Sequence, residues 1–245
     1  MPEHHARISP RPAPVRAAMR LHVKHARDGA RVAAAITFED AGKRFGDEWV
    51  LEHVDLQVPR GAVFGLIGPS GSGKTTAVRL ANGAYRPDAG RVTVLGRESS
   101  ERRARERVNL GYVPQQPPLY EALSLWENLN FQASLNGVRF RRRRRLRELL
   151  DLVDLGDDAT KRVSEVSGGM RRRLALAATL VHRPPVLMLD EPTAGIDPIL
   201  RRRFWEHFRT LAREGHTFVI TTQHIEEATS CDLVGLLAAG RVAAA

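Results

Sequence analysis

The sequence of 245 residues predicts an α/β fold with a parallel sheet, and three features lead to that prediction. Short segments near the start alternate apolar and polar residues, as half-exposed antiparallel strands do. Later segments are continuous apolar runs separated by stretches of helical composition, which is typical of a parallel sheet covered by helices. A glycine-rich loop joins one such run to a helix. With 42% hydrophobic and 27% charged residues, the composition suits one large globular domain with subdomains.

The expected elements follow in chain order. The first two strands should pair in an antiparallel β subdomain, and the run at 62–67 should be a strand buried on both faces. Ser124 and Glu127 form a capping box, so a helix should begin there, and the helical pattern continues to residue 154. A helical subdomain is therefore expected over about 116–180. Strands are predicted at 36–40, 54–58, 62–67, 90–96, 109–115, 186–190, 217–222 and 233–237, and helices at 74–84, 124–154, 170–181 and 198–213.

The net charge of +10 is unevenly distributed along the chain. Residues 1–35 hold seven Lys or Arg side chains against two acidic ones, a net charge of +5, with four prolines and no hydrophobic period. We expect this arm to be disordered and the folded domain to span 36–245. The Arg-rich, acid-poor composition of the arm is like that of a transit peptide. A later start at Met19 is the alternative.

Three further features limit the class of protein. Cys231 is the only cysteine, so the chain cannot form an internal disulfide. The longest apolar run, at 174–181, is far shorter than the roughly 20 residues that span a bilayer. The Arg-rich segment at 139–149 is expected to be the solvated face of a helix, and contact with lipid headgroups or RNA is the alternative interpretation.

The segment GPSGSGKT at 68–75 fits the phosphate-binding template G-x-x-x-x-G-K-[ST] without a gap. An apolar strand precedes it and a helix follows it, which is the context that the template requires. Backbone N–H groups of such a loop converge on phosphate oxygens at the positive end of the helix. Lys74 should reach the terminal phosphates, and the Thr75 hydroxyl should bind Mg²⁺. The predicted nucleotide-binding residues here are Gly68, Pro69, Ser70, Gly71, Ser72, Gly73, Lys74, Thr75 and Thr76.

The segment VLMLDE at 186–191 ends in an acidic pair. Four apolar residues put Asp190 at the end of a buried strand, beside the phosphate loop in sheets of this kind. Asp190 can then hold Mg²⁺ through water, and Glu191 can polarise an attacking water molecule. The combination predicts hydrolysis of a nucleoside triphosphate rather than binding alone.

The segment VSGGM at 166–170 offers a second anion site, because a serine and two glycines at a helix start leave N–H groups and a hydroxyl free. With this segment between the phosphate loop and the acidic pair, the chain resembles the ATP-binding subunit of an ABC transporter. The resemblance covers about residues 36–242, with six motifs in the family's order. It implies an α/β P-loop NTPase core with an antiparallel β subdomain and an inserted helical subdomain.

The resemblance also implies roles for residues outside the phosphate loop. Phe45 would stack on adenine, and Gln115 would sense Mg²⁺ and the attacking water, so that Thr75, Gln115 and Asp190 form the metal set. Asp197 would run along the interface with a second ATP-binding subunit, identical or different. The signature segment would act in trans on the γ-phosphate held by that second subunit; it consists of Ser167, Gly168, Gly169 and Met170.

One position of the pattern remains open in the segment TTQHIEEA at 221–228. The family has a histidine after the last core strand that donates a hydrogen bond to the γ-phosphate. If the segment EEA is aligned with its counterpart in the family, Gln223 occupies the position of that histidine. If His224 is instead matched to the family's histidine, the strand must shift by one residue. We predict Gln223, since an amide can donate to phosphate as an imidazole does. The catalytic residues expected are therefore Glu191 and Gln223.

The resulting functional hypothesis is an ATP-hydrolysing subunit that powers a separate transmembrane permease from the cytoplasmic face of the plasma membrane. The signature and the switch segment are similar to those of ABC-2 type exporters, including the drug-resistance branch. The permease is expected to dock near Gln115 and the helical subdomain. The alternative is a soluble ABC-type ATPase acting on ribosomes or nucleic acid, and a binding module without catalysis is a third option.

Overall fold

The computed structural model describes residues 33–102, 104–115, 118–139 and 142–244. Most of the arm that the sequence predicts to be disordered, up to residue 32, lies outside the described residues.

A six-stranded sheet forms the centre of the described molecule, in the order β10-β9-β3-β8-β7-β6. All neighbouring strands are parallel except β9 and β10, which are antiparallel. The predicted parallel sheet is therefore confirmed, with an antiparallel edge strand that the sequence did not predict. The strands are β3 (Val63–Ile67), β6 (Leu110–Val113), β7 (Val186–Asp190), β8 (Thr217–Thr222), β9 (Leu233–Ala238) and β10 (Arg241–Ala244).

A second, antiparallel sheet has the order β2-β1-β4-β5, which confirms the predicted antiparallel β subdomain. Its first two strands are more than twice as long as the alternating segments that predict them. The two strands remain paired beyond the alternating segments because their register shifts at several points. Asp40 and His53 adopt positive φ angles within these irregular parts. The strands are β1 (Ala34–Phe45), β2 (Glu48–Pro59), β4 (Ala89–Val94) and β5 (Arg97–Glu98).

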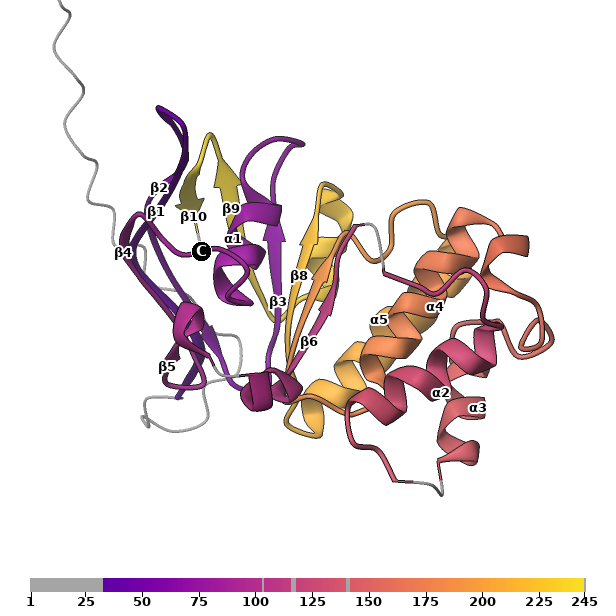
Figure 1. The fold of residues 1–245 in the computed structure, drawn as a ribbon. Coiled ribbons are helices and arrows are strands. Elements are labelled where there is room, and N and C mark those ends of the chain that lie inside the picture. The colour runs from indigo at the N-terminus through magenta and orange to yellow at the C-terminus, as the bar shows by residue number, and fades with distance from the viewer. Residues whose placement is uncertain (1–32, 103, 116–117, 140–141, 245) are drawn as a thin grey trace, which may run out of the picture.

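Helices cover both faces of the six-stranded sheet (Figure 1). The α1 helix lies between the two sheets, and the other α-helices lie on the opposite side of the six-stranded sheet. The α-helices are α1 (Lys74–Ala81), α2 (Leu125–Leu135), α3 (Arg143–Leu152), α4 (Gly168–Leu180) and α5 (Pro198–Arg213). Short 3₁₀ helices are η1 (Ser99–Glu101), η2 (Ala104–Asn109), η3 (Val163–Glu165) and η4 (Ile225–Ser230).

The prediction of one helical stretch over 124–154 is wrong, although its start is correct. The capping box of Ser124 and Glu127 is present at the beginning of α2. The α2 helix ends at Leu135 because Gly137 adopts a left-handed conformation with φ of 69°. A second helix, α3, begins at Arg143.

Two arginines of the Arg-rich segment hold these helices together instead of facing solvent. Arg142 donates to the side-chain oxygen atoms of Asn130 and Ser134 on α2, at 2.9 and 2.6 Å. Arg145 donates to the carbonyl oxygens of Leu180 and Val181 at the end of α4, at 2.6 and 3.0 Å. Burial lowers the pKa of the Arg145 guanidinium. Arg145 therefore satisfies carbonyl groups that a helix end leaves without intrahelical partners.

The two hydrophobic clusters of the core meet at the six-stranded sheet. In β7, Leu187 and Leu189 belong to the cluster beneath α2–α5, whereas Val186 and Met188 belong to the cluster that includes α1 and the antiparallel sheet. Both faces of the strand are therefore buried, as its continuous apolar sequence predicts. None of the helices in the described ranges is both long and apolar enough to cross a membrane.

Candidate functional site

The candidate site lies where three central strands end at one edge of the sheet. The register pairs Ile67 of β3 with Thr222 of β8, and Thr221 of β8 with Asp190 of β7. The carboxyl ends of these strands are consequently level with one another. Ligands bind at this edge in open α/β sheets, where the loops that follow the strands converge.

The phosphate loop follows β3, and its backbone leaves no space for larger residues at two glycines. A Cβ atom at Gly68 would lie 2.1 Å from the carbonyl oxygen of Leu237. Gly73 adopts φ of 104°, and a Cβ atom there would lie 2.7 Å from a methyl carbon of Leu51. Gly73 is the N-cap of α1, and no side chain caps the helix there. The first-turn N–H groups of α1 thus face the loop without a competing side-chain acceptor.

Lys74 lies inside this loop with its side chain 5% exposed. Its Nζ atom donates hydrogen bonds to the carbonyl oxygens of Gly68 and Pro69, at 2.8 and 2.9 Å. The same atom lies 3.9 Å from Oε1 of Glu191. The structure therefore brings together two predicted site residues that are far apart in the sequence.

Asp190 is buried at the end of β7, with only one of its carboxylate oxygens satisfied. Oδ1 accepts a hydrogen bond of 2.6 Å from the Thr221 hydroxyl. Oδ2 is inaccessible to solvent and has no hydrogen-bond partner within the described residues. A buried carboxylate oxygen without a partner costs free energy unless a cation or a bound water satisfies it. The residues present therefore fit a hydrated magnesium ion beside Asp190.

Glu191 is held in a strained backbone conformation next to Asp190. Its φ angle is 51°, in the left-handed region that residues other than glycine and asparagine seldom adopt. Its N–H group donates to both the hydroxyl and the carbonyl oxygen of Thr221, at 3.0 and 3.2 Å. Strain of this kind persists only where surrounding contacts enforce it, and it is found preferentially at functional sites.

Both candidates for the switch position lie near Glu191. A small pocket follows the ends of β7 and β8, and its walls consist of Glu191, Thr193, Ala194, Thr222, Gln223 and His224. Gln223 is exposed and His224 is half-buried. The His224 Nδ1 atom lies 3.6 Å from a carboxylate oxygen of Glu226. Because both side chains line the same pocket as Glu191, the assignment of Gln223 stays a prediction.

Sequence reasoning did not single out two residues that support this region. Thr221 bridges Asp190 and Glu191, as described above. Glu227 is buried in η4 and accepts a 2.7 Å hydrogen bond from the Thr193 hydroxyl. It thereby ties the turn after β8 to the loop after β7. In the sequence, the only signal for Thr221 is a threonine at the end of a buried strand.

The remaining predicted residues lie on other elements. Phe45 ends β1, with its side chain 45% exposed and its ring against Tyr85. Gln115 is exposed just after β6.

The signature segment and Asp197 both start helices; Ser167, Gly168, Gly169 and Asp197 are exposed, whereas Met170 is half-buried against the core. Ser167 is the N-cap of α4 and accepts a hydrogen bond from the N–H group of Met170. Asp197 is the N-cap of α5. In the described part of the chain, no hydrogen bond or ion pair joins the signature segment to the phosphate loop.

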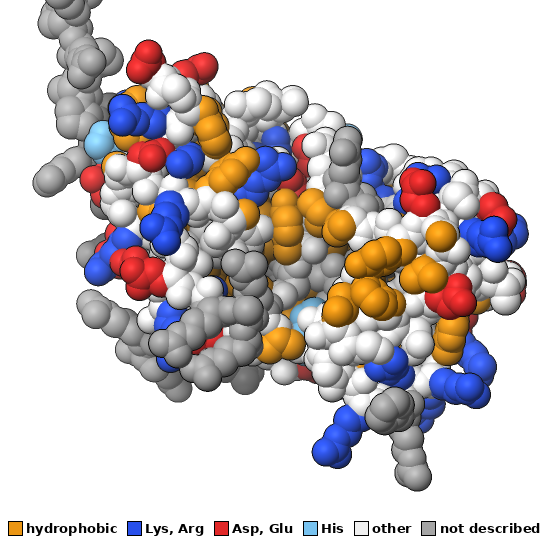
Figure 2. All heavy atoms as spheres, viewed as in Figure 1, with side chains coloured by type: hydrophobic (Ala, Val, Ile, Leu, Met, Phe, Trp, Pro, Cys, Tyr) orange, Lys and Arg blue, Asp and Glu red, His pale blue; other side chains and the backbone are white. Residues whose placement is uncertain are grey.

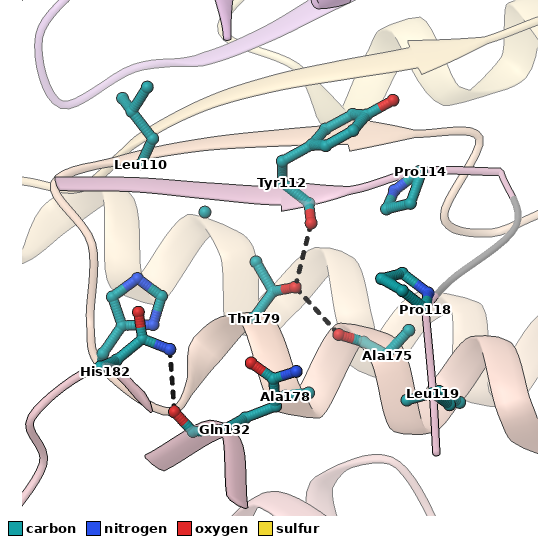
Figure 3. A pocket seen from close by; sticks show the side chains of 12 residues that line it. Leu110, Tyr112, Pro114, Pro118, Leu119, Gln132, Ala175, Ala178, Thr179 and His182 are labelled. Atoms are coloured by element: carbon teal, nitrogen blue, oxygen red, sulfur yellow. Dashed lines mark hydrogen bonds between the residues drawn. The ribbon is translucent and has the colours of Figure 1, made fainter. Parts of the chain in front are cut away.

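A groove of about 200 Å³ separates the edge strand β6 from α2 and α4 (Figure 3). Thr179 lies at its floor, where its hydroxyl group hydrogen-bonds to the carbonyl oxygens of Ala175 and Tyr112. His182 lies at one end of the groove, and burial lowers the pKa of its imidazole. Apolar side chains surround this hollow on the face drawn in Figure 2. Gln115 follows Pro114, which lines the groove.

Comparison with known proteins gives a consistent picture. The family model described as ABC transporter matches residues 51–194. The daunorubicin resistance ATP-binding protein DrrA3 of Streptomyces coeruleorubidus is 45% identical over 212 residues, which are 86% of this chain and 67% of that protein. The probable multidrug ABC transporter ATP-binding protein YbhF of Escherichia coli is 36% identical over 223 residues. Those residues are 91% of this chain but only 39% of YbhF, so the chain spans well under half the length of that relative.

A solved structure supports the fold. The dimeric post-hydrolysis state of an ATP-binding cassette bound to ADP and Pi superposes with a TM-score of 0.77 at 26% sequence identity, over 85% of this chain and 97% of that one. The predicted fold class is thereby confirmed. The relatives named above are transporter ATP-binding proteins, so they give no support to the alternative of an ATPase acting on ribosomes or nucleic acid.

Proposed function

Because this chain belongs to the ABC transporter family, as an ATP-binding component, we propose that it hydrolyses ATP to drive a separate membrane permease of the exporter type. The observation that carries the proposal is the meeting of Lys74 with Glu191 at the phosphate loop, at 3.9 Å. A cation for the phosphates and a carboxylate for the water thus lie at one strand edge. This is the arrangement that phosphoryl transfer to water requires.

The chain's own residues would perform the reaction mainly by positioning and charge. The loop N–H groups and Lys74 would bind the β- and γ-phosphates. Glu191 would accept a proton from the attacking water as general base. Thr75, Gln115 and Asp190 would hold a magnesium ion, which supplies neutralisation of the phosphate charge. Phe45 would stack on the adenine ring through its exposed face.

A second ATP-binding subunit would complete each site. Ser167, Gly168 and Gly169 of the signature segment are exposed at the start of α4, where backbone N–H groups and a hydroxyl suit the γ-phosphate of a partner. Asp197 would lie along the same interface. The likeness to a cassette that is itself a dimer bound to ADP and Pi supports this arrangement.

The permease would dock in the groove between β6, α2 and α4, beside Gln115. A partly apolar hollow with a few polar groups is what an inserted helix of a partner needs. The chain would then be a peripheral protein at the cytoplasmic face of the membrane. The names of the two relatives, one a daunorubicin resistance protein and one a probable multidrug transporter component, support an exporter of the ABC-2 type.

The proposed function predicts that a bulky side chain in the groove prevents binding of the permease but leaves ATP hydrolysis intact. Gln132→Trp would place a large ring in the groove, because Gln132 is half-buried in its wall. We expect the variant to hydrolyse ATP within about twofold of the parent, but to lose most copurification with the permease from detergent-solubilised membranes. Gln57→Trp on the exposed face of β2 is the matched control. A parent chain that turns over no ATP, or that sediments with ribosomes instead of with a membrane protein, would contradict the proposal.

The switch position gives a second prediction. If Gln223 donates to the γ-phosphate, Gln223→Ala should lower the rate of ATP hydrolysis about tenfold or more, as loss of one charge-assisted hydrogen bond does. His224→Ala should have a small effect, and Gln223→His should be tolerated.

The pH dependence of the rate tests the same assignment independently. An unperturbed histidine titrates near pH 6.5, whereas an amide does not titrate at all. Rates measured between about pH 6 and 8 should therefore show an added titration in Gln223→His that the parent lacks. If His224→Ala is the inactive variant instead, the alignment on EEA is wrong.

A further inference from the structure

The proposed function leaves the exposed arginines of the Arg-rich segment without a role. Arg142 and Arg145 bind α2 and α4, as described above. The other arginines that the structure describes in this segment point to solvent; they are Arg139, Arg143, Arg144 and Arg147. We refer to these four residues as the basic surface.

Apart from Arg144, the basic surface contributes no ion pair that stabilises α3 in the described part of the chain. Arg143 and Arg147 lie one turn apart, where like charges repel. Arg143 and Arg144 lie in the first turn of α3, in which no acidic residue is present, although the helix dipole disfavours cations at that end. Within the described residues, only Arg144 of the four has an ion pair, with Glu148 at 3.3 Å. Three of these four exposed charges are therefore not used in ion pairs with residues that the structure describes and can contact a partner outside the chain.

The position of the basic surface relates it to the proposed docking groove. Gln132 and Asn136 at the end of α2 line the groove. Arg142 is hydrogen-bonded to Ser134 in the same turn of α2, so the connection to α3 leaves directly from the groove's rim. Lys and Arg side chains gather there along the lower edge of the molecule, on the same face as the apolar hollow (Figure 2).

One apolar side chain lies in this region as well. Leu135 is 64% exposed at the last position of α2, between Ser134 and Asn136. An exposed leucine beside arginines is typical of protein surfaces at a membrane interface, where the apolar group enters the headgroup region and the guanidinium groups stay with the phosphates.

We propose that the basic surface and Leu135 bind the anionic phospholipid headgroups of the membrane that contains the permease. The inference rests on the proposed function, since a permease docked in the groove would turn this face of the molecule to the bilayer. Guanidinium groups suit the phosphates of lipids because their N–H groups donate in pairs. RNA is a weaker candidate, because the exposed apolar side chain described in this region is the aliphatic Leu135, which suits a lipid surface better than the stacking of a base.

The test measures binding of the full-length chain to vesicles of phosphatidylcholine with 30% phosphatidylglycerol, and to vesicles of phosphatidylcholine alone. The variant is the triple substitution Arg139→Gln, Arg143→Gln and Arg147→Gln. Its matched control removes the same charge from exposed positions of α5, as Arg202→Gln, Arg203→Gln and Arg213→Gln. All proteins keep residues 1–35, so the basic arm contributes equally to each.

We expect the first variant to lose at least tenfold of its affinity for the anionic vesicles, since each arginine near such a surface contributes about fivefold. The control should lose less than about threefold, and neither protein should bind the neutral vesicles. Equal losses in the two variants would overturn the proposal. So would a loss of binding to a 20-nucleotide RNA by the first variant with unchanged binding to vesicles, which would select RNA as the partner.

Two further measurements distinguish a misfolded variant, a failure of the proposed function and a failure of the proposed lipid binding. Far-ultraviolet circular dichroism and the thermal midpoint should match the parent in both variants, because the substituted side chains are exposed. Within the described residues the first variant loses no ion pair, and the control loses only the surface pair of Arg202 with Glu206 and the surface hydrogen bonds of Arg213, which contribute little. ATP hydrolysis should also be unchanged in both. Absence of hydrolysis in the parent would contradict the proposed function alone, whereas the vesicle comparison decides the role of the basic surface.

Discussion

Glu191→Gln is expected to bind ATP with magnesium as the parent does, but to hydrolyse it about 10²–10⁴-fold more slowly. The amide has the shape of the carboxylate and leaves the backbone and the Thr221 contacts in place, but it cannot accept a proton from the attacking water. Release of phosphate in single-turnover conditions measures the slow step directly. Glu214→Gln, an exposed substitution beyond the end of α5, is the control and should keep the parent's rate.

The same variant reports on the proposed dimer. Slow hydrolysis should trap two chains around two ATP molecules, which size-exclusion chromatography with light scattering would detect as a doubled mass. A folded Glu191→Gln protein that stays monomeric at saturating ATP would count against the action of Ser167 and its neighbours in trans. A variant that hydrolyses ATP at the parent's rate would remove Glu191 from the reaction.

Lys74→Ala is expected to lose about a hundredfold or more in affinity for ATP. The ammonium group already makes two short hydrogen bonds to loop carbonyls and lies within the curve of the phosphate loop. It would donate to phosphate oxygens there, and charge-assisted hydrogen bonds each contribute roughly 1.5–3 kcal/mol. Titration with a fluorescent ATP analogue measures the loss.

The control for Lys74→Ala must separate lost binding from lost folding. Lys161→Ala removes an exposed ammonium that pairs with Asp158 at the surface, and it should bind ATP normally. Thermal denaturation without nucleotide should be cooperative for both variants. A Lys74→Ala protein that binds and hydrolyses ATP like the parent would show that the likeness of the loop to a phosphate-binding template is misleading.

The most accurate predictions from the sequence are for elements whose limits are marked by neighbouring residues. The strand β7 and the helix α5 have the predicted bounds. A buried apolar run and an acidic pair delimit the first, and an aspartate N-cap followed by Pro198 begins the second. By contrast, the break after α2 was missed because Gly137 is one weak signal within a long stretch of helix-forming residues. The edge strand β10 was missed because four residues carry little periodicity.

For the site, the sequence identified the residues but not the contacts that hold them. Thr221 and Glu227 act through partners 31 and 34 residues away, and no local pattern encodes such a pairing. The same is true of Arg145, which reads as one more charge in an arginine run although it binds the end of α4. Contacts of this kind depend on how the chain packs, which only the folded structure provides.

The continuity of α4 from the signature residues to the groove has a mechanical consequence. The helix begins at the signature residues, and its other end carries Ala178 and Thr179 into the groove, about 20 Å away along the 13 residues of the helix. Arg145 anchors that far end to α3. A tilt of about 10° about the anchored end would carry Ser167 sideways by roughly 3–4 Å, enough to make or break a hydrogen bond. If the permease and the second subunit bind as proposed, such a tilt of α4 about its groove end would move the signature residues toward or away from the nucleotide held by the partner.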